Sequence, residues 1–179
     1  VGFPFATKQN YYTASLFILF PSALLGRSRE RMEKFSWKSK FHDALINVGN
    51  VYLFSGDYEN AEKYYRKSLQ IADSALDERA QSYSWQAFAF LHEKQGNLNQ
   101  AVHYSLKALN IAKEAQYLEG QYINTKKLSD LYGRLKNFQK AFQYLGESDV
   151  LKDSITKANE IDNLAQLETY FDFQNLQAQ

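Results

Sequence analysis

The sequence predicts an all-α fold, a right-handed superhelix of antiparallel helix pairs with a C-terminal capping helix. Three observations support this prediction. A turn-like segment returns every 40 residues, the apolar residues around it follow helical spacing, and aromatic residues make up 16% of the chain, which argues against disorder. A fixed period in this range is typical of stacked helix pairs that cover one another's apolar faces. Such a stack offers a binding surface and rarely a catalytic pocket.

The recurring segment has the character of a turn between two helices. It occurs three times at 40-residue steps, in residues 56–61, 96–101 and 136–141. Gly56 and Gly96 suit a residue with positive φ at the end of a helix. The position that follows always holds a residue that suits the N-cap of the next helix, Asp57, Asn97 or Asn137.

Apolar residues flank each turn at the spacing of amphipathic helices. In the first copy they are Leu45, Val48 and Tyr52 before the turn, then Ala61, Tyr64, Tyr65 and Leu69 after it. This i, i+3, i+4, i+7 pattern indicates one helix on each side of the turn. Small residues stand where the two helices of a pair would cross, Gly49 with Ala61 and Ala89 with Ala101. A small side chain at the crossing permits the close approach of the two backbones.

These positions resemble the pattern of the tetratricopeptide repeat family. The first copy fills the family's slots with Leu45, Val48, Gly49, Tyr52, Gly56, Asp57, Tyr58 and Ala61. The proline that closes each unit of the family is absent, and its place is taken by Asp73, Lys113 and Asp153. We therefore expect the second helix to continue through residues 71–75 and 111–115. This continuation accounts for a unit longer than the usual length of about 34 residues.

The chain divides into three parts. Residues 1–40 are expected to hold a partial N-terminal repeat and a linker, with a connection near residues 27–34 before a helix that starts around Ser36. Residues 41–149 hold three tetratricopeptide-like repeats. Residues 150–179 are expected to form a C-terminal capping or extension helix. This last part resembles the segment that follows the repeats in Bacteroidetes-type sensor kinases and regulators.

Charge and composition exclude several classes of partner. The net charge is +1, so no overall field favours nucleic acid or a membrane surface. Residues 27–40 carry six Lys/Arg against two Glu, and residues 147–179 carry seven Asp/Glu against two Lys, which is typical of solvated helix faces. The apolar stretch of residues 11–26 is shorter than the roughly 20 residues that span a bilayer. The absence of cysteine fits a periplasmic as well as a cytoplasmic location.

No catalytic pattern is present in the sequence. The chain has three histidines, of which His92 takes the slot of Tyr52 and Tyr132 and is expected to pack in the core, while His103 is expected to face outward. There is no HExxH motif, no Gly-rich phosphate loop and no supported Ser/His/Asp grouping. We therefore expect neither an enzyme, nor a cofactor, nor a metal site.

The family resemblance implies that the first helix of each pair lines a concave groove. Carried over by register, the residues expected to bind a peptide or protein are Asp43, Ile46, Asn50, Leu53, Tyr83, Gln86, Phe90, Glu93, Ile123, Lys126 and Asp130. Asn50 could bond a peptide backbone amide, and Tyr83 and Phe90 could supply apolar anchors. The alternative is that these side chains simply pack against neighbouring helices. Chaperone C-termini are not expected as ligands, because Lys126 is the only cation in the set.

Two hypotheses for function follow. The first is a non-catalytic scaffold that binds a protein or peptide, as the sensing or interaction segment of a signalling or regulatory protein. The second is a structural self-association module that forms a homo-oligomer through an exposed N-terminal half-repeat.

Overall fold

The computed structural model describes residues 22–177, and over that range its regular secondary structure consists of α-helices joined by short turns. The helices are α2 (Ser22–Phe54), α3 (Tyr58–Ala75), α4 (Glu78–Lys94), α5 (Leu98–Glu114), α6 (Leu118–Arg134) and α7 (Phe138–Gln177). The expected N-terminal half-repeat and most of the apolar stretch lie in residues 1–21, outside the described residues.

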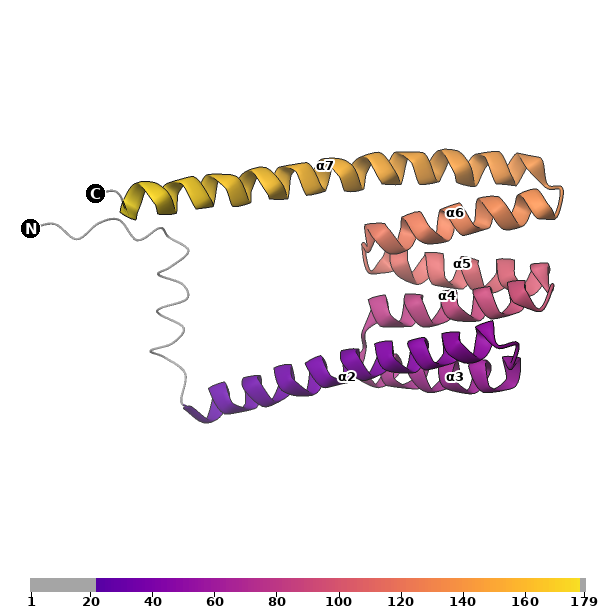
Figure 1. The fold of residues 1–179 in the computed structure, drawn as a ribbon, viewed down its shortest axis with the longest axis horizontal. Helices are drawn as coiled ribbons and strands as arrows, with labels where there is room; N and C mark the ends of the chain where they lie inside the picture. The colour runs from indigo at the N-terminus through magenta and orange to yellow at the C-terminus, as the bar shows by residue number, and fades with distance from the viewer. Residues whose placement is uncertain (1–21, 178–179) are drawn as a thin grey trace, which may run out of the picture.

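The helices form three antiparallel pairs that stack side by side, which confirms the predicted superhelix of helix pairs (Figure 1). The pairs are α2 with α3, α4 with α5, and α6 with α7. The first helices also contact one another, α2 with α4 and α4 with α6, so they form one layer of the stack. The second helices start at residues 58, 98 and 138, which reproduces the 40-residue period.

The turns within the pairs have the predicted geometry. Gly56 and Gly96 take φ values of 84° and 78°, and Lys136 takes the same left-handed conformation at 59°. Asp57 Oδ1 accepts a hydrogen bond from the Asn60 backbone at 3.1 Å, as expected for an N-cap. In the third copy Asn137 caps the Lys140 backbone N–H in the same way at 3.2 Å, whereas Asn97 makes no such bond in the second.

The turns between the pairs show no glycine. Leu76 and Gln116 adopt the left-handed conformation there, with φ values of 53° and 52°. Asp77 follows and caps the Ala80 backbone N–H at 3.0 Å. As expected from the missing proline, the second helices continue to Ala75 in α3 and to Glu114 in α5.

Small residues mark the crossing points within the pairs. Ala61, Ala89 and Ala101 have at most 1% of their surface exposed. A methyl group on Gly49 would lie 2.7 Å from Cδ1 of the fully buried Tyr65. The positions 40 residues later hold Ala89 and Ser105. The first copy thus pairs the smallest residue, glycine, with a large tyrosine, and the second copy pairs alanine with the much smaller serine.

The N-terminal part of the chain differs from the prediction. We expected a connection near residues 27–34 and a helix that starts around Ser36, and this expectation is wrong. Helix α2 begins at Ser22 and continues without a break to Phe54. Residues 22–40 are rich in Arg, Lys and Glu, which favour helix, and the chain has no proline after residue 21 to stop the helix.

The C-terminal part extends a repeat helix and forms no separate cap. The first part of α7 packs on α6, where Tyr144 stacks on Tyr132 with ring centroids 5.6 Å apart. Beyond Ile155, residues 156–171 are all exposed, so they do not cover the end of the stack. The sequence has no glycine or proline after Gly146, and the helix therefore has no local reason to end there.

Candidate functional site

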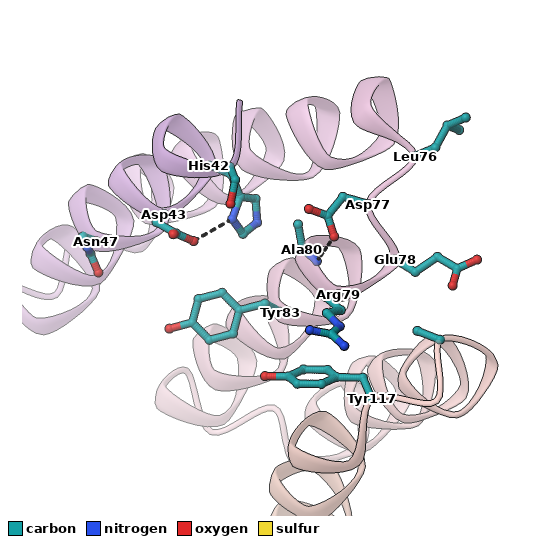
Figure 2. Close-up of a pocket in the computed structure, with 12 residues that line it drawn as sticks. His42, Asp43, Asn47, Leu76, Asp77, Glu78, Arg79, Ala80, Tyr83 and Tyr117 are labelled. Atoms are coloured by element: carbon teal, nitrogen blue, oxygen red, sulfur yellow. Dashed lines mark hydrogen bonds and ion pairs between the residues drawn. The ribbon is translucent and has the colours of Figure 1, made fainter. Parts of the chain in front are cut away.

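A hollow lies on the layer of first helices. It has a volume of about 930 Å³ and lies between α2, the first turns of α4 and the loop that precedes α6. Figure 2 shows its walls, with His42, Asp43 and Asn47 from α2 facing Arg79 and Tyr83 from α4. Tyr117 closes the side next to α6.

A chain of hydrogen bonds lies behind the wall of this cavity. His42 is 2% exposed, and its Nε2 lies 2.9 Å from Ser84 Oγ, which lies 3.1 Å from Ser68 Oγ. Ser68 donates its own proton to the Tyr65 carbonyl oxygen at 2.8 Å. The Ser84 hydroxyl therefore lies within hydrogen-bond distance of both His42 Nε2 and Ser68 Oγ. These bonds connect α2 to α3 and α4 and fix the back of the cavity.

His42 also faces the Asp43 carboxylate. Ser84, His42 and Asp43 therefore lie in a row, as the serine, histidine and aspartate of a hydrolase triad do. Asp43 Oδ1 lies 3.1 Å from His42 Nδ1, on the other side of the ring from Ser84. Ser84, however, has no exposed surface, and a substrate carbonyl could not reach its hydroxyl. The arrangement is therefore a structural network. The sequence gives little sign of it, because His42 and Ser84 are 42 residues apart.

Aromatic rings with polar tips form the wall opposite α2. Tyr83 is 44% exposed, and the Arg79 guanidinium lies 5.2 Å from the centre of the Tyr117 ring. Burial raises the pKa of the Tyr117 phenol and Glu119 raises it further, whereas Arg79 lowers it. Rings of this kind supply apolar contact area together with hydroxyl groups that can bond a ligand.

Amides continue the same face along α2. Asn47 is exposed and lines the cavity. Asn50 is half-buried, and its Oδ1 accepts a hydrogen bond from the Tyr65 hydroxyl at 2.7 Å. The NH₂ group of Asn50 is the part of its amide that this bond leaves free for a ligand.

The other end of the first-helix layer is apolar and basic. Phe54 and Phe90 meet edge to face with centroids 6.0 Å apart, and Lys94 lies over both rings. Lys127 lies over Phe90 and also bonds Glu93 at 2.9 Å. Arg134 bonds the second oxygen of Glu93 at 2.6 Å, so Glu93 holds α6 against α4.

The structure corrects two of the expected site residues. Ile46 and Leu53 are 2% and 3% exposed and belong to the core cluster around Tyr65, so a ligand cannot reach them. The position one residue later in each case, Asn47 and Phe54, is exposed instead. One residue is a rotation of about 100° around a helix, and that is enough to move a side chain from the core to the groove.

The remaining expected residues have some exposed surface and stay predictions. The exposed ones are Asp43, Tyr83, Ile123, Lys126 and Asp130, and the half-buried ones are Asn50, Gln86, Phe90 and Glu93. Reasoning from the sequence missed four residues on the same face, Asn47, Phe54, Arg79 and Lys127. A helical wheel in the correct register would have found Asn47 and Phe54.

The other histidines lie where we expected them. His92 stacks on Tyr104 with centroids 5.0 Å apart and an interplanar angle of 9°, and His103 is exposed. Among the side chains that the structure describes, no group of three or more His, Cys, Asp or Glu residues is placed to hold a metal ion. None of the helices within residues 22–177 combines the length and the apolar character that crossing a membrane requires.

Comparisons with known proteins point to one repeat family. Residues 41–114 match the model of the tetratricopeptide repeat. Tetratricopeptide repeat protein 29 of Trypanosoma brucei brucei is 31% identical over 100 residues, which are 55% of this chain but only 21% of that protein. The chain therefore spans about a fifth of that relative. The crystal structure of the TPR domain of Arabidopsis FLU matches 65% of this chain and 98% of its own, with a TM-score of 0.58 and 19% identity, which shows the shared fold.

Proposed function

We propose that the helix pairs of this chain, which are tetratricopeptide repeats, bind an extended segment of a partner protein along α2, α4 and α6. Repeats of this family are generally scaffolds for protein interaction, and catalysis is not typical of them. The observation that carries the proposal is the open cavity of about 930 Å³ on that face, with Tyr83 and Asn47 in its wall. Cavities of this size accept side chains of a ligand.

The face offers different chemistry along its length. Asp43 and Glu78 make one end acidic, although Arg79 offsets part of that charge. Asn47 and Asn50 follow, and amides suit the backbone of an extended peptide. Phe54 and Phe90 lie under lysines at the other end. This order supports a peptide that places a basic residue in the cavity and an apolar residue next to an acidic one on the two phenylalanines.

We further propose that the chain is the sensing segment of a signalling protein. The support is the continuity of α7, which packs on α6 in the last repeat and then leaves the stack as the same helix. A ligand that moves α6 relative to α4 would also move α7, because α7 packs on α6 through the stacked rings of Tyr132 and Tyr144. A single helix carries such a displacement away from the groove.

A peptide library tests the groove. The protein is used to select binders from random peptides displayed on phage, and their affinities are measured by fluorescence anisotropy. We expect the pair Asn47→Ala and Tyr83→Ala to weaken the selected peptides by about tenfold or more. Asn50→Ala is less suitable, because it also breaks the bond to Tyr65.

His103→Ala serves as the matched control, because it removes an aromatic side chain from the exposed surface of α5, away from the cavity. It should leave the affinities unchanged. Two results would contradict peptide binding at this face. One is a selection that enriches no peptide, and the other is a set of enriched peptides that bind the double variant as tightly as the parent.

A further inference from the structure

Two helical arms extend beyond the stack of repeats. The α2 arm is residues 22–40, and Lys38 near its base already reaches the end of α3, where its Nζ bonds the Ser74 carbonyl oxygen at 3.1 Å. The α7 arm is residues 152–177. At 1.5 Å per residue the arms are about 28 and about 39 Å long. Both point away from the same side of the stack, and among the described residues α2 and α7 do not contact each other (Figure 1).

The arms carry opposite charge. The α2 arm has six Lys/Arg against two Glu, a net charge of +4. The α7 arm has five Asp/Glu against two Lys, a net charge of −3. The chain as a whole is almost neutral, so this separation places a basic and an acidic helix at the two edges of one molecule. Opposite charges of this kind favour contact between the arms.

The α7 arm also shows an uncovered apolar stripe. Ile161, Leu164, Leu167 and Phe171 are 68%, 61%, 50% and 60% exposed. Their spacing of three, three and four residues places them on one face of the helix. A helix that stands alone in water is only marginally stable, and a stripe of this kind is typical of a face that packs on another helix.

Exposed apolar rings also lie where the α2 arm joins the stack. Trp37 and Phe41 are 50% and 46% exposed, with ring centroids 6.0 Å apart. Both arms therefore combine net charge with apolar surface, and the two charges are of opposite sign. The two arms of one molecule cannot cover each other's apolar surface, because the repeats separate them (Figure 1).

We propose that a second copy of this chain covers both arms in a two-fold symmetric dimer. A half-turn of the molecule in the plane of Figure 1 exchanges its upper and lower edges and reverses the direction of the arms. The α2 arm of each copy then lies along the α7 arm of the other, and the two helices run parallel. The spacing of the arms is the same in both copies, so both contacts form at once and the assembly is closed.

Charge reversal in the full chain tests the pairing of the α2 arm with the α7 arm. One variant carries Glu160→Lys, Asp162→Lys and Glu168→Lys on the α7 arm, and a second carries Arg27→Glu, Arg29→Glu and Arg31→Glu on the α2 arm. Sedimentation equilibrium measures the dimer Kd. We expect the unmodified chain to dimerise, and each variant alone to do so on the order of 100-fold more weakly.

Mixing the two variants provides the decisive measurement. Each contact in a mixed dimer again joins a positive arm to a negative one, so the mixture should dimerise with a Kd close to that of the unmodified chain. A matched control with Glu59→Lys, Glu114→Lys and Glu119→Lys changes the charge equally on exposed residues of the repeats. This control should keep the dimer.

Three results would overturn the proposal. The first is an unmodified chain that is a monomer at every soluble concentration. The second is a dimer whose Kd neither charge-reversal variant changes, and the third is a mixture of the two variants that stays monomeric. A general loss of folding is detected separately by circular dichroism, and Leu164→Gln with Leu167→Gln then tests the apolar stripe without any change of charge. That variant should also weaken the dimer, and an unchanged Kd would contradict the pairing.

Discussion

A methyl group at position 49 tests how α2 and α3 pack. Gly49 lies in the interior of α2, and its added Cβ would fall 2.7 Å from Cδ1 of Tyr65. The Tyr65 ring is fully buried and its hydroxyl is bonded to Asn50 at 2.7 Å, so the ring has little freedom to move away. Gly49→Ala must therefore displace either the ring or one of the two helices.

The magnitude follows from two opposing contributions. Overpacking a core costs about 1–3 kcal/mol. Alanine is better than glycine in the interior of a helix by about 1 kcal/mol, which offsets part of this cost. The methyl group would meet a fully buried ring, so the upper part of the overpacking range applies, about 2–3 kcal/mol. We therefore expect Gly49→Ala to lower the free energy of unfolding by about 1–2 kcal/mol. For a chain of this length that corresponds to a Tm lower by about 2–8 °C.

Urea unfolding followed by circular dichroism measures this change, and a second background isolates its cause. The second repeat pairs Ala89 with Ser105 at the equivalent positions, so the combination of alanine and serine is already used in this chain. In a Tyr65→Ser background, Gly49→Ala should therefore be neutral or stabilising. If Gly49→Ala costs the same in both backgrounds, or nothing in the parent, the contact with Tyr65 does not determine the packing.

Three further changes have defined outcomes. Ala101→Leu should cost about 1–3 kcal/mol in urea unfolding because Ala101 is fully buried where α4 and α5 cross, and an unchanged Tm would place the crossing elsewhere. Lys136→Gly should raise the free energy of unfolding by about 0.5–1 kcal/mol, because a non-glycine residue is strained at a φ of 59°, and a lower Tm would count against this reasoning. Burial raises the pKa of Tyr65 to about 12, above the value near 10 of an unfolded chain. This contribution to stability is complete below pH 10 and is lost as the pH rises towards 12, so Tyr65→Phe should show a weaker loss of stability over that range in thermal melts.

The fold could be predicted because each repeat uses local signals. Gly56 with Asp57, and Gly96 with Asn97, are neighbours in sequence, and a positive φ followed by a helix start depends on the backbone of a few residues only. The turns between pairs were harder to predict, because Leu76 and Gln116 adopt the left-handed conformation without being glycine. Backbone hydrogen bonds close these turns, from the Asp77 N–H to the Ala72 carbonyl oxygen at 3.1 Å and from the Tyr117 N–H to the Ala112 carbonyl oxygen at 2.8 Å.

The ends of the chain show where local signals are insufficient. Residues 27–34 carry charges and no regular apolar pattern, yet they continue α2 because nothing in them stops a helix. The same holds for α7 beyond Gly146. A helix that begins in a packed repeat can extend past it, so the absence of a stop signal was the better guide to its length.

By itself, the sequence determined the repeating unit of this protein, with its helix pairs, its turns and the small residues at the crossings, because these depend on spacing along one chain. Only the tertiary structure decided which side of each first helix is open. Ile46 and Leu53 enter the core while Asn47 and Phe54 face the groove, and the difference is one residue in the rotation of α2. The bonds from His42 to Ser84 and from Glu93 to Arg134 join residues that are 42 and 41 positions apart in the sequence, and no local pattern records them.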